Sequence, residues 1–540
     1  MFKLSSKIIP LIAALLILAL SSCSSSESGQ TPEVADEANN SSDSGQMPGS
    51  GDGGDNSGDP GQMQGGEDDG GGNSGDPDQM PDNEEGGGES VLPDPAPVVV
   101  SSRTPFELIS RLPVDHAVFT DVHSVLPFAV SDEGTRVLIK ASFFDDTDTF
   151  VRQFVSYDAS INNATVLDFT PVTDSFPAFD MTWETMAYAN GCDTIIQQRV
   201  LSEAISLNSV HGLNALCANQ ESAQISNDGE TILMPSSRID NGSSVPIIFG
   251  VSGGTLITLD KQFLQQADAA LAGRISTAHD PDLSADGRYV VATVIVADDP
   301  VTVGQNINFS AGSIVVDTRT AESRVIGLSN YERFNCERCD ILPVSAPVIS
   351  GNGRYVVYEQ APEIQIPGEE PVSNTTLFRY DINTDETQQV RAGTRGTSEI
   401  VISDNGARVA WRVGADVQIA YVGSDEIISL QDGFKFCTDD PDDCLFATAR
   451  FITNEAIEMS GDGSALIVYL IPQQDTGASA ADRSELLHFD LDTGTLSRLA
   501  PGANEPFYAL SHDGRTVALI ALDEQGIETI AVLRAVGDGG

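Results

Sequence analysis

The chain has 540 residues and a formal net charge of −52 at pH 7, from 80 Asp and Glu against 28 Lys and Arg. Binding to phosphates requires clustered Lys and Arg, so this balance argues against a nucleic-acid partner. The length exceeds one ordinary domain, but the composition is uneven and only one part of the chain is apolar enough to fold.

The first 22 residues have the layout of a secretory signal peptide. Lys3 and Lys7 precede an apolar run of about 13 residues, too short for a membrane span, which needs roughly 20. The residues Leu20-Ser21-Ser22 before Cys23 resemble the lipobox of bacterial lipoproteins. This resemblance implies that Cys23 is lipidated, and Ser24 after it favours the outer membrane. We therefore expect an exported lipoprotein, facing the periplasm or the cell surface and held by its lipid alone; an ordinary signal peptide cleaved near Ser22 is the alternative.

Residues 23–97 form a predicted disordered tether. This segment is rich in Gly, Ser, Asp, Glu and Pro, lacks Lys and Arg, and contains 18 acidic residues. Such a composition cannot bury a hydrophobic core. The folded part still has 62 acidic against 26 basic residues, which we interpret first as a solvated surface.

A short turn motif, Ser-x-x-Gly after an apolar strand, recurs along residues 98–540. Each copy precedes a β-branched or aromatic run, which is typical of a hairpin. Seven copies are clear, and a degenerate eighth at Met181–Ala189, aligned on Thr182, makes the serine spacing 44 to 66 residues instead of leaving one gap of 95. The turn residues, interpreted as structural, are Ser131 and Gly134; Ser226, Asp228 and Gly229; Ser284, Asp286 and Gly287; Ser350 and Gly353; Ser403 and Gly406; Ser460, Asp462 and Gly463; and Ser511, Asp513 and Gly514.

Repeats of this length with several strands each are typical of a β-propeller. We predict an all-β fold of eight blades with four antiparallel strands each, with seven blades as the alternative. After the last turn only two strands fit, at 516–522 and 528–535. Residues 106–112 resemble the outer strand of the preceding blade at 495–501, so we predict that they complete the last blade and remove its open edge.

The Ser-x-Asp-Gly turns resemble those of TolB-like propellers and related WD-like repeat proteins of the bacterial envelope. The resemblance covers roughly residues 100 to 540 and implies the fold rather than one activity, because the family includes scaffolds, carbohydrate-active enzymes and the propeller halves of peptidases. The proline that usually follows the serine is absent in every copy.

The six cysteines beyond Cys23 are an even number in an exported protein, which favours disulfides. Proximity in sequence predicts three pairs. A redox pair at 336 and 339 is disfavoured because the context is a loop, and zinc because no histidine is close in sequence. The predicted pairs are Cys192 with Cys217, Cys336 with Cys339, and Cys437 with Cys444.

Other candidate sites are weaker. Gly250 to Gly254 fits the Gly-x-Ser-x-Gly pattern of a nucleophile elbow, but strand-like residues on both sides indicate a hairpin. An apolar pattern of helical spacing predicts a short helix within 260–275. Two acidic loops could hold Ca²⁺, although solvated loops are the preferred interpretation and no cofactor is expected. The loops are residues 144–148 and, more attractively, Asp439, Asp440, Asp442 and Asp443 between two cysteines.

The preferred functional hypothesis is a non-enzymatic, lipid-anchored propeller that binds an envelope protein or an extracellular ligand. The alternative is a lyase or hydrolase acting on a polysaccharide, with its site at the central channel. The six histidines are scattered in the sequence, and His512 occupies the variable position after a turn serine. No catalytic residue is therefore predicted.

Overall fold

The computed structural model describes residues 106–536 with internal gaps. The predicted leader, Cys23 and the tether lie outside the described residues. The gaps are 114–118, 120–121, 145–146, 148, 170–176, 191–192, 200–203, 212–216, 219–222, 239–243, 269–270, 273, 298–306, 334–345, 361–374, 395–396, 414–415, 425, 431–448, 451–456, 473–484, 502–506 and 523–527.

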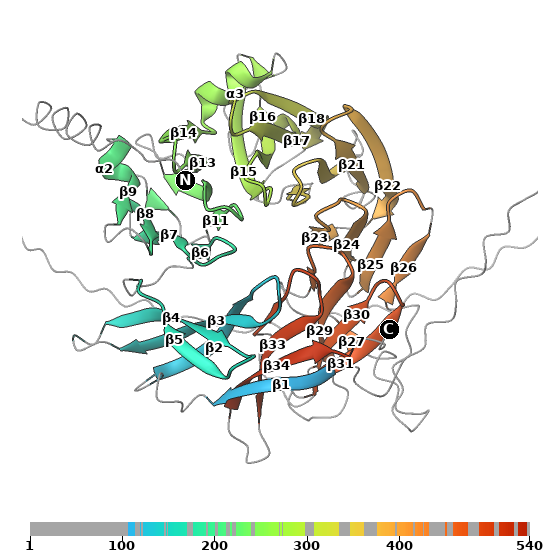
Figure 1. Cartoon of the computed structure of the whole chain (residues 1–540). Coiled ribbons are helices and arrows are strands. Elements are labelled where there is room, and N and C mark those ends of the chain that lie inside the picture. The colour runs from blue at the N-terminus through green and yellow to red at the C-terminus, as the bar shows by residue number, and fades with distance from the viewer. Residues whose placement is uncertain are drawn as a thin grey trace, which may run out of the picture. The chain divides into compact units, whose positions relative to one another are not determined.

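The described residues form eight antiparallel sheets, numbered here as blades 1 to 8 (Figure 1). Blade 1 contains β2 (Val122–Val130), β3 (Arg136–Phe144), β4 (Phe150–Asp158) and β5 (Asn163–Val166). Blade 2 contains β6 (Ala178–Phe179), β7 (Thr185–Asn190), β8 (Asp193–Gln198) and β9 (Ile205–Ser206). Blade 3 contains β10 (Cys217–Ala218), β11 (Gln224–Ile225), β12 (Thr231–Arg238), β13 (Ser244–Gly250) and β14 (Thr255–Thr258). Blade 4 contains β15 (Ile275–Leu283), β16 (Tyr289–Ala297), β17 (Ile307–Asp317) and β18 (Ser323–Arg333).

The second half of the chain repeats this arrangement. Blade 5 contains β19 (Val348–Ile349), β20 (Tyr355–Gln360), β21 (Thr375–Asp381) and β22 (Glu386–Thr394). Blade 6 contains β23 (Thr397–Ile402), β24 (Arg408–Val413), β25 (Asp416–Tyr421) and β26 (Ile427–Ser429). Blade 7 contains β27 (Ala449–Arg450), β28 (Ile457–Met459), β29 (Ala465–Pro472), β30 (Glu485–Asp490) and β31 (Thr495–Pro501). Blade 8 contains β32 (Tyr508–Leu510), β33 (Thr516–Leu522), β34 (Glu528–Ala535) and β1 (Phe106–Pro113).

Every blade has four strand positions, as the repeats predict. In blades 3 and 7 two short strands share the inner position, because β10 and β11 both pair with β12, and β27 and β28 both pair with β29. Within the described ranges, two short helices accompany the sheets, α2 (Leu207–His211) and α3 (Lys261–Ala267). The predicted helix at 260–275 is confirmed but shorter, since it begins after the N-cap Asp260 and ends where Asp268 becomes extended.

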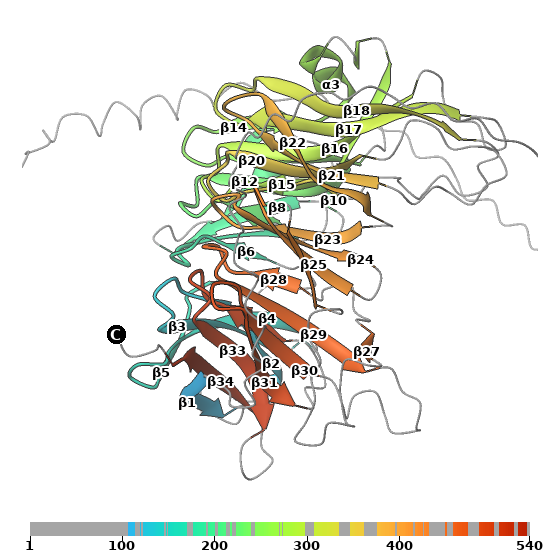
Figure 2. The same ribbon diagram turned by 90° about the vertical axis from the view of Figure 1, so that its right-hand side faces the viewer.

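Packing between the blades closes a ring. Eight clusters of buried apolar side chains each join two consecutive blades. The cluster that joins the last blade to the first combines Leu112 and Val532 of blade 8 with Val137 and Tyr157 of blade 1. Figure 2 shows this junction from the side, where β33, β34 and β1 lie beside β2, β3 and β4. Eight interfaces for eight sheets leave the seven-bladed alternative without support.

The strand β1 closes the ring as predicted. It pairs antiparallel with β34, from Phe106 opposite Ala535 to Pro113 opposite Thr529, with an irregularity between Leu108 and Ser110. The first described strand is therefore the outer strand of the last blade. This pairing covers the edge of β34 and joins the two ends of the described chain.

The turns between the first and second strands of blades 3 to 8 share one hydrogen-bond scheme, illustrated by blade 4. The Ser284 hydroxyl donates to Asp286 Oδ1 at 2.6 Å, and the Tyr289 N–H donates to Ser284 Oγ at 3.0 Å. Gly287 has φ +69°, and a Cβ atom there would lie 2.8 Å from the Cβ of Ser226 in blade 3. The glycine is required by its backbone conformation and by close contact with the neighbouring blade.

Blade 2 corrects the alignment of the degenerate copy. The residue at the serine position is Asp180, two residues before Thr182, and the residue at the glycine position is Trp183 with φ +58°. Asp180 Oδ1 accepts hydrogen bonds from the N–H groups of Glu184 and Thr185, at 2.8 and 3.0 Å. One carboxylate thus replaces the Ser–Asp pair, which is why alignment on a serine or threonine misplaces the turn.

Candidate functional site

The turns between first and second strands lie on one side of the ring, which we call the turn face. There the backbones of successive turns are linked by N–H to carbonyl hydrogen bonds that run from blade 2 to blade 8. We call the linked turns the axial collar. Its bonds are Met181 to Asn227 (3.3 Å), Asn227 to Ala285 (2.8 Å), Asp286 to Gly351 (3.2 Å), Asn352 to Asp404 (3.0 Å), Asp404 to Gly461 (2.7 Å) and Asp462 to His512 (3.2 Å).

Two side chains of the collar meet across a third blade. His512 of blade 8 donates through Nε2 to Asp404 Oδ2 of blade 6 at 2.6 Å, and both side chains are a little over a third exposed. Between them, the turn of blade 7 has Gly461 at the equivalent position. A Cβ on Gly461 would lie 2.2 Å from the His512 ring, so the absence of a side chain there permits the contact.

Carboxylates surround His512. Burial alone would lower the pKa of His512, but the hydrogen bond to Asp404 and the charges of Asp404, Asp132 and Asp462 raise it. Burial also raises the pKa of Asp132, against the opposing charge of His512. The sequence could not indicate this cluster, because its members come from the turns of blades 1, 6, 7 and 8.

Beside the collar, a groove with a volume of about 880 Å³ crosses the turn face of blades 7, 8 and 1. We call it the acidic groove, because its lining, as far as the described residues go, includes five carboxylates and two arginines. Hydroxyl groups of Thr and Ser complete much of the lining. The charged residues are Glu133, Asp462, Asp490, Asp492, Asp513, Arg515 and Arg534.

Several of these carboxylates are held by backbone N–H groups. Asp490 Oδ1 accepts from Asp492 and Thr493 at 2.9 and 3.0 Å, and Asp462 Oδ1 accepts from Ser464 at 2.8 Å. Burial opposes the charge of Asp462, but hydrogen bonds from Ser464 and Ser460 and the nearby His512 lower its pKa. The Asp462 carboxylate is therefore ionised at neutral pH and fixed in place.

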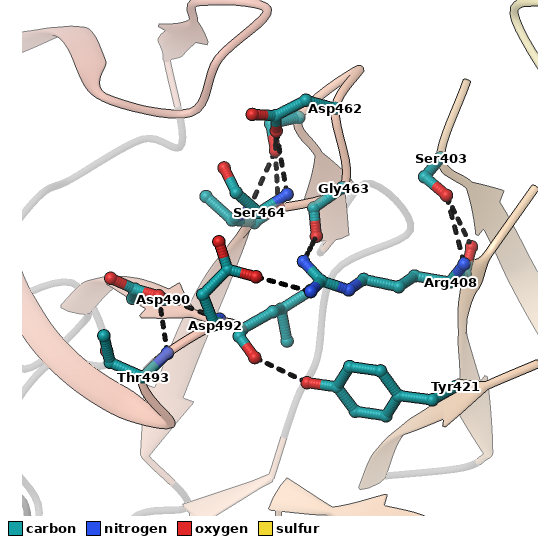
Figure 3. Close-up of polar contacts among 12 residues, drawn as sticks. Ser403, Arg408, Tyr421, Asp462, Gly463, Ser464, Asp490, Asp492 and Thr493 are labelled. Carbon is teal, nitrogen blue, oxygen red and sulfur yellow. Dashed lines mark hydrogen bonds and ion pairs between the residues drawn. The ribbon is translucent and has the colours of Figure 1, made fainter. Parts of the chain in front are cut away.

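Arg408 of blade 6 holds the blade 7 side of the groove. Figure 3 shows its guanidinium between the Gly463 carbonyl and the Asp492 carboxylate, both of which accept hydrogen bonds from it. The Tyr421 hydroxyl donates to the Leu491 carbonyl at 2.6 Å in the same interface. These contacts fix Asp492 relative to the neighbouring blade.

His488 lines the same groove and is 5 % exposed. Its Nε2 lies 2.9 Å from the Gly514 carbonyl oxygen, and Phe106 packs edge-on against the ring at 4.8 Å. Because the carbonyl can only accept, Nε2 carries the hydrogen. Burial lowers the pKa of His488, so the ring is neutral at pH 7 and joins β30 to the turn of blade 8.

Two further acids lie on the innermost strands. Burial raises the pKa of Glu458 on β28 to about 7 and that of Asp282 on β15 to about 6. Asp282 Oδ2 accepts from the Ile349 N–H of blade 5 at 2.8 Å. Both acids lie two residues before a turn serine. An alignment of the turns in the sequence could therefore have identified them as acids on the innermost strands.

The other predicted sites have separate outcomes. Residues 251–254 form a turn between the antiparallel strands β13 and β14, so the hairpin interpretation of the Gly-x-Ser-x-Gly pattern is confirmed. Cys217 begins β10, whereas the other predicted disulfide cysteines and Asp439, Asp440, Asp442 and Asp443 lie outside the described residues.

Within the described ranges, no three Asp, Glu, His or Cys side chains are grouped as a metal site would require. The described helices include none long and apolar enough to cross a membrane.

The fold and the turn face together define the class of protein, an eight-bladed β-propeller with an acidic groove. No family model matches the sequence, and no curated protein matches it either. Among solved structures, the chain is similar to a putative TolB from Agrobacterium tumefaciens, with 12% identity, TM-score 0.28, and coverage of 69% of this chain and 93% of that one.

Two enzymes are also among the similar structures. An oligogalacturonate lyase in complex with manganese has 12% identity and TM-score 0.36, and the match covers 76% of this chain and 88% of the lyase. Dipeptidyl peptidase 4 of Porphyromonas gingivalis has 10% identity and TM-score 0.40, over 77% of this chain and 57% of the peptidase. All three TM-scores are below 0.5, so the function has to be argued from this chain's own residues.

Proposed function

We propose that this protein is a lipid-anchored binding scaffold of the cell envelope whose acidic groove binds an extended, Lys- or Arg-rich segment of a partner protein. The observation that carries the proposal is the groove itself, whose described lining has five carboxylates and two arginines over three blades, with one carboxylate, Asp492, also paired with Arg408. Charge complementarity between binding surfaces favours a cationic partner and opposes an anionic polymer.

The geometry of the groove supports binding without rearrangement. Its carboxylates come from short turns whose backbone N–H groups hold Asp462 and Asp490, and Arg408 ties Asp492 to blade 6. Groups held in place before binding lose little conformational freedom when a ligand arrives. A Lys or Arg side chain can therefore pair with several carboxylates at low entropic cost.

Glu133→Lys is expected to weaken binding of a synthetic Lys/Arg-rich peptide to the full-length protein by roughly tenfold, or about 1.4 kcal/mol. The charge reversal places a cation in the lining of the groove. Isothermal titration calorimetry at physiological salt would measure the dissociation constant. Its dependence on salt concentration would show how much of the binding free energy is electrostatic.

Glu322→Lys is the matched control. Glu322 is exposed and lines a separate cavity next to blade 4, so its reversal changes the net charge equally without touching the acidic groove. Equal loss of affinity in both variants would mean that the peptide responds only to overall charge, and the proposed groove site would be rejected.

The anchor is tested separately. Cys23→Ala is expected to move the protein from the membrane fraction to the soluble fraction, because the proposed attachment is through the lipid alone. Immunoblots of fractionated cells that express the wild-type and variant chains would show this. Retention of the variant in the membrane fraction, together with an unmodified mass for the wild-type N-terminus, would refute the lipid anchor.

A further inference from the structure

We propose that Asp404 and His512 form a pH-sensitive clasp that locks the axial collar across blade 7. Such a clasp would couple the turns of blades 6, 7 and 8, and its argument does not rest on the ligand proposed for the acidic groove. The two side chains come from blades 6 and 8, which are not neighbours, and their contact is 2.6 Å long.

Space for the clasp is provided by two glycines. A Cβ on Gly461 of blade 7 would lie 2.2 and 2.4 Å from the His512 atoms Cδ2 and Nε2, and one on Gly351 of blade 5 would lie 2.1 Å from Asp404 Oδ1. Neither glycine has a backbone conformation that other residues avoid. The presence of glycine at positions 351 and 461 is therefore explained by the space that the Asp404 and His512 side chains occupy.

The clasp acts on the same turns as the collar. The Asp404 N–H donates to the Gly461 carbonyl at 2.7 Å, and the Asp462 N–H donates to the His512 carbonyl at 3.2 Å. The backbone thus connects blade 6 to blade 7 and blade 7 to blade 8, while the side chains connect blade 6 directly to blade 8. Releasing the side-chain contact would leave the turn of blade 7 tied to its neighbours by these backbone bonds, by the Arg408 contact with the Gly463 carbonyl, and by the Ser464 hydroxyl, which donates to the Asp513 carbonyl at 3.1 Å.

The charge on His512 depends on pH in the range where imidazole titrates. The charged groups that face it are Asp404 from blade 6, Asp132 from blade 1 and Asp462 from blade 7. All three are acids, so they stabilise the protonated ring. Because the pKa of His512 is raised in the folded state, protonated His512 stabilises the fold. This contribution to the free energy of unfolding is complete below the unfolded pKa of about 6.5 and is lost as the pH rises through the folded pKa.

The test is an NMR titration of the histidines in the full-length chain, with His512 assigned by its absence from His512→Gln. The His512 midpoint is expected above about 6.5 in the wild type and lower in Asp404→Asn, which keeps the shape but removes the charge. Gly461→Ala should also lower the midpoint, because its methyl group separates the pair. Gly250→Ala is the control, since a Cβ there meets only ordinary contacts at 3.6 Å and beyond.

Stability provides the second readout. The loss of unfolding free energy caused by His512→Gln should be larger at about pH 6 than at about pH 9. His279→Gln should show the opposite trend, because burial lowers the pKa of His279. An unshifted His512 midpoint in both Asp404→Asn and Gly461→Ala, or a His512→Gln loss independent of pH, would overturn the proposal.

Discussion

Leu112→Ala is expected to lower the free energy of unfolding by about 2–5 kcal/mol, the usual cost of truncating a fully buried leucine. Leu112 is 2 % exposed on β1 and packs in the cluster that joins blade 8 to blade 1. Its loss leaves a cavity where the ring closes. Chemical denaturation of the full-length chain, followed by circular dichroism, would measure the effect.

Leu108→Ala is the matched control because the residue lies on the same strand but is 47 % exposed. It should change stability by no more than about 0.5 kcal/mol. If Leu112→Ala were as mild as Leu108→Ala, β1 would not be the strand that seals the ring. Comparing the two variants shows whether β1 stabilises the ring through the buried Leu112 side chain or only through its pairing with β34.

Gly406→Ala is expected to destabilise the protein by about 3 kcal/mol or more, through backbone strain combined with a clash between blades. Gly406 has φ +68°, and a Cβ atom would lie 2.2 Å from Cδ2 of Tyr355 in blade 5. The Tyr355 ring has little room to move, because the guanidinium groups of Arg354 and Arg379 lie 4.8 and 4.4 Å from its centre.

Gly254→Ala isolates the backbone contribution. Gly254 has φ +60° in the hairpin between β13 and β14, and a Cβ atom added there would meet no neighbouring atom within 4 Å. It should lose only about 1–2 kcal/mol, the cost of a left-handed conformation. Equal melting temperatures for the two variants would contradict the claim that turn glycines serve as contacts between blades.

Most of the architecture could be predicted because it follows from local chemistry that recurs. Ser and Gly at fixed positions mark seven of the eight turns, and the apolar runs beside them mark the strands. The similarity between residues 106–112 and 495–501 was enough to predict the closing strand. The exception was blade 2, where Asp180 and Trp183 perform the same tasks with different side chains.

The candidate site was less accessible to prediction because it depends on contacts between distant repeats. Asp404 and His512 are 108 positions apart, and each alone is an ordinary polar turn residue. Their meeting depends on an intervening glycine and on the curvature of the ring. Likewise, the acidic groove combines turns from both ends of the described chain, and an acidic composition alone does not indicate where carboxylates converge.

Hydrogen–deuterium exchange of the full-length protein with and without a Lys/Arg-rich peptide tests the binding proposal most directly. The acidic groove predicts slower exchange in the turns of blades 7, 8 and 1, at residues 132–135, 462–464, 492–495 and 513–515. The segment 23–97, with its 18 acidic residues, is the competing site. Protection confined to that segment, with unchanged exchange in the four turns, would contradict binding in the groove.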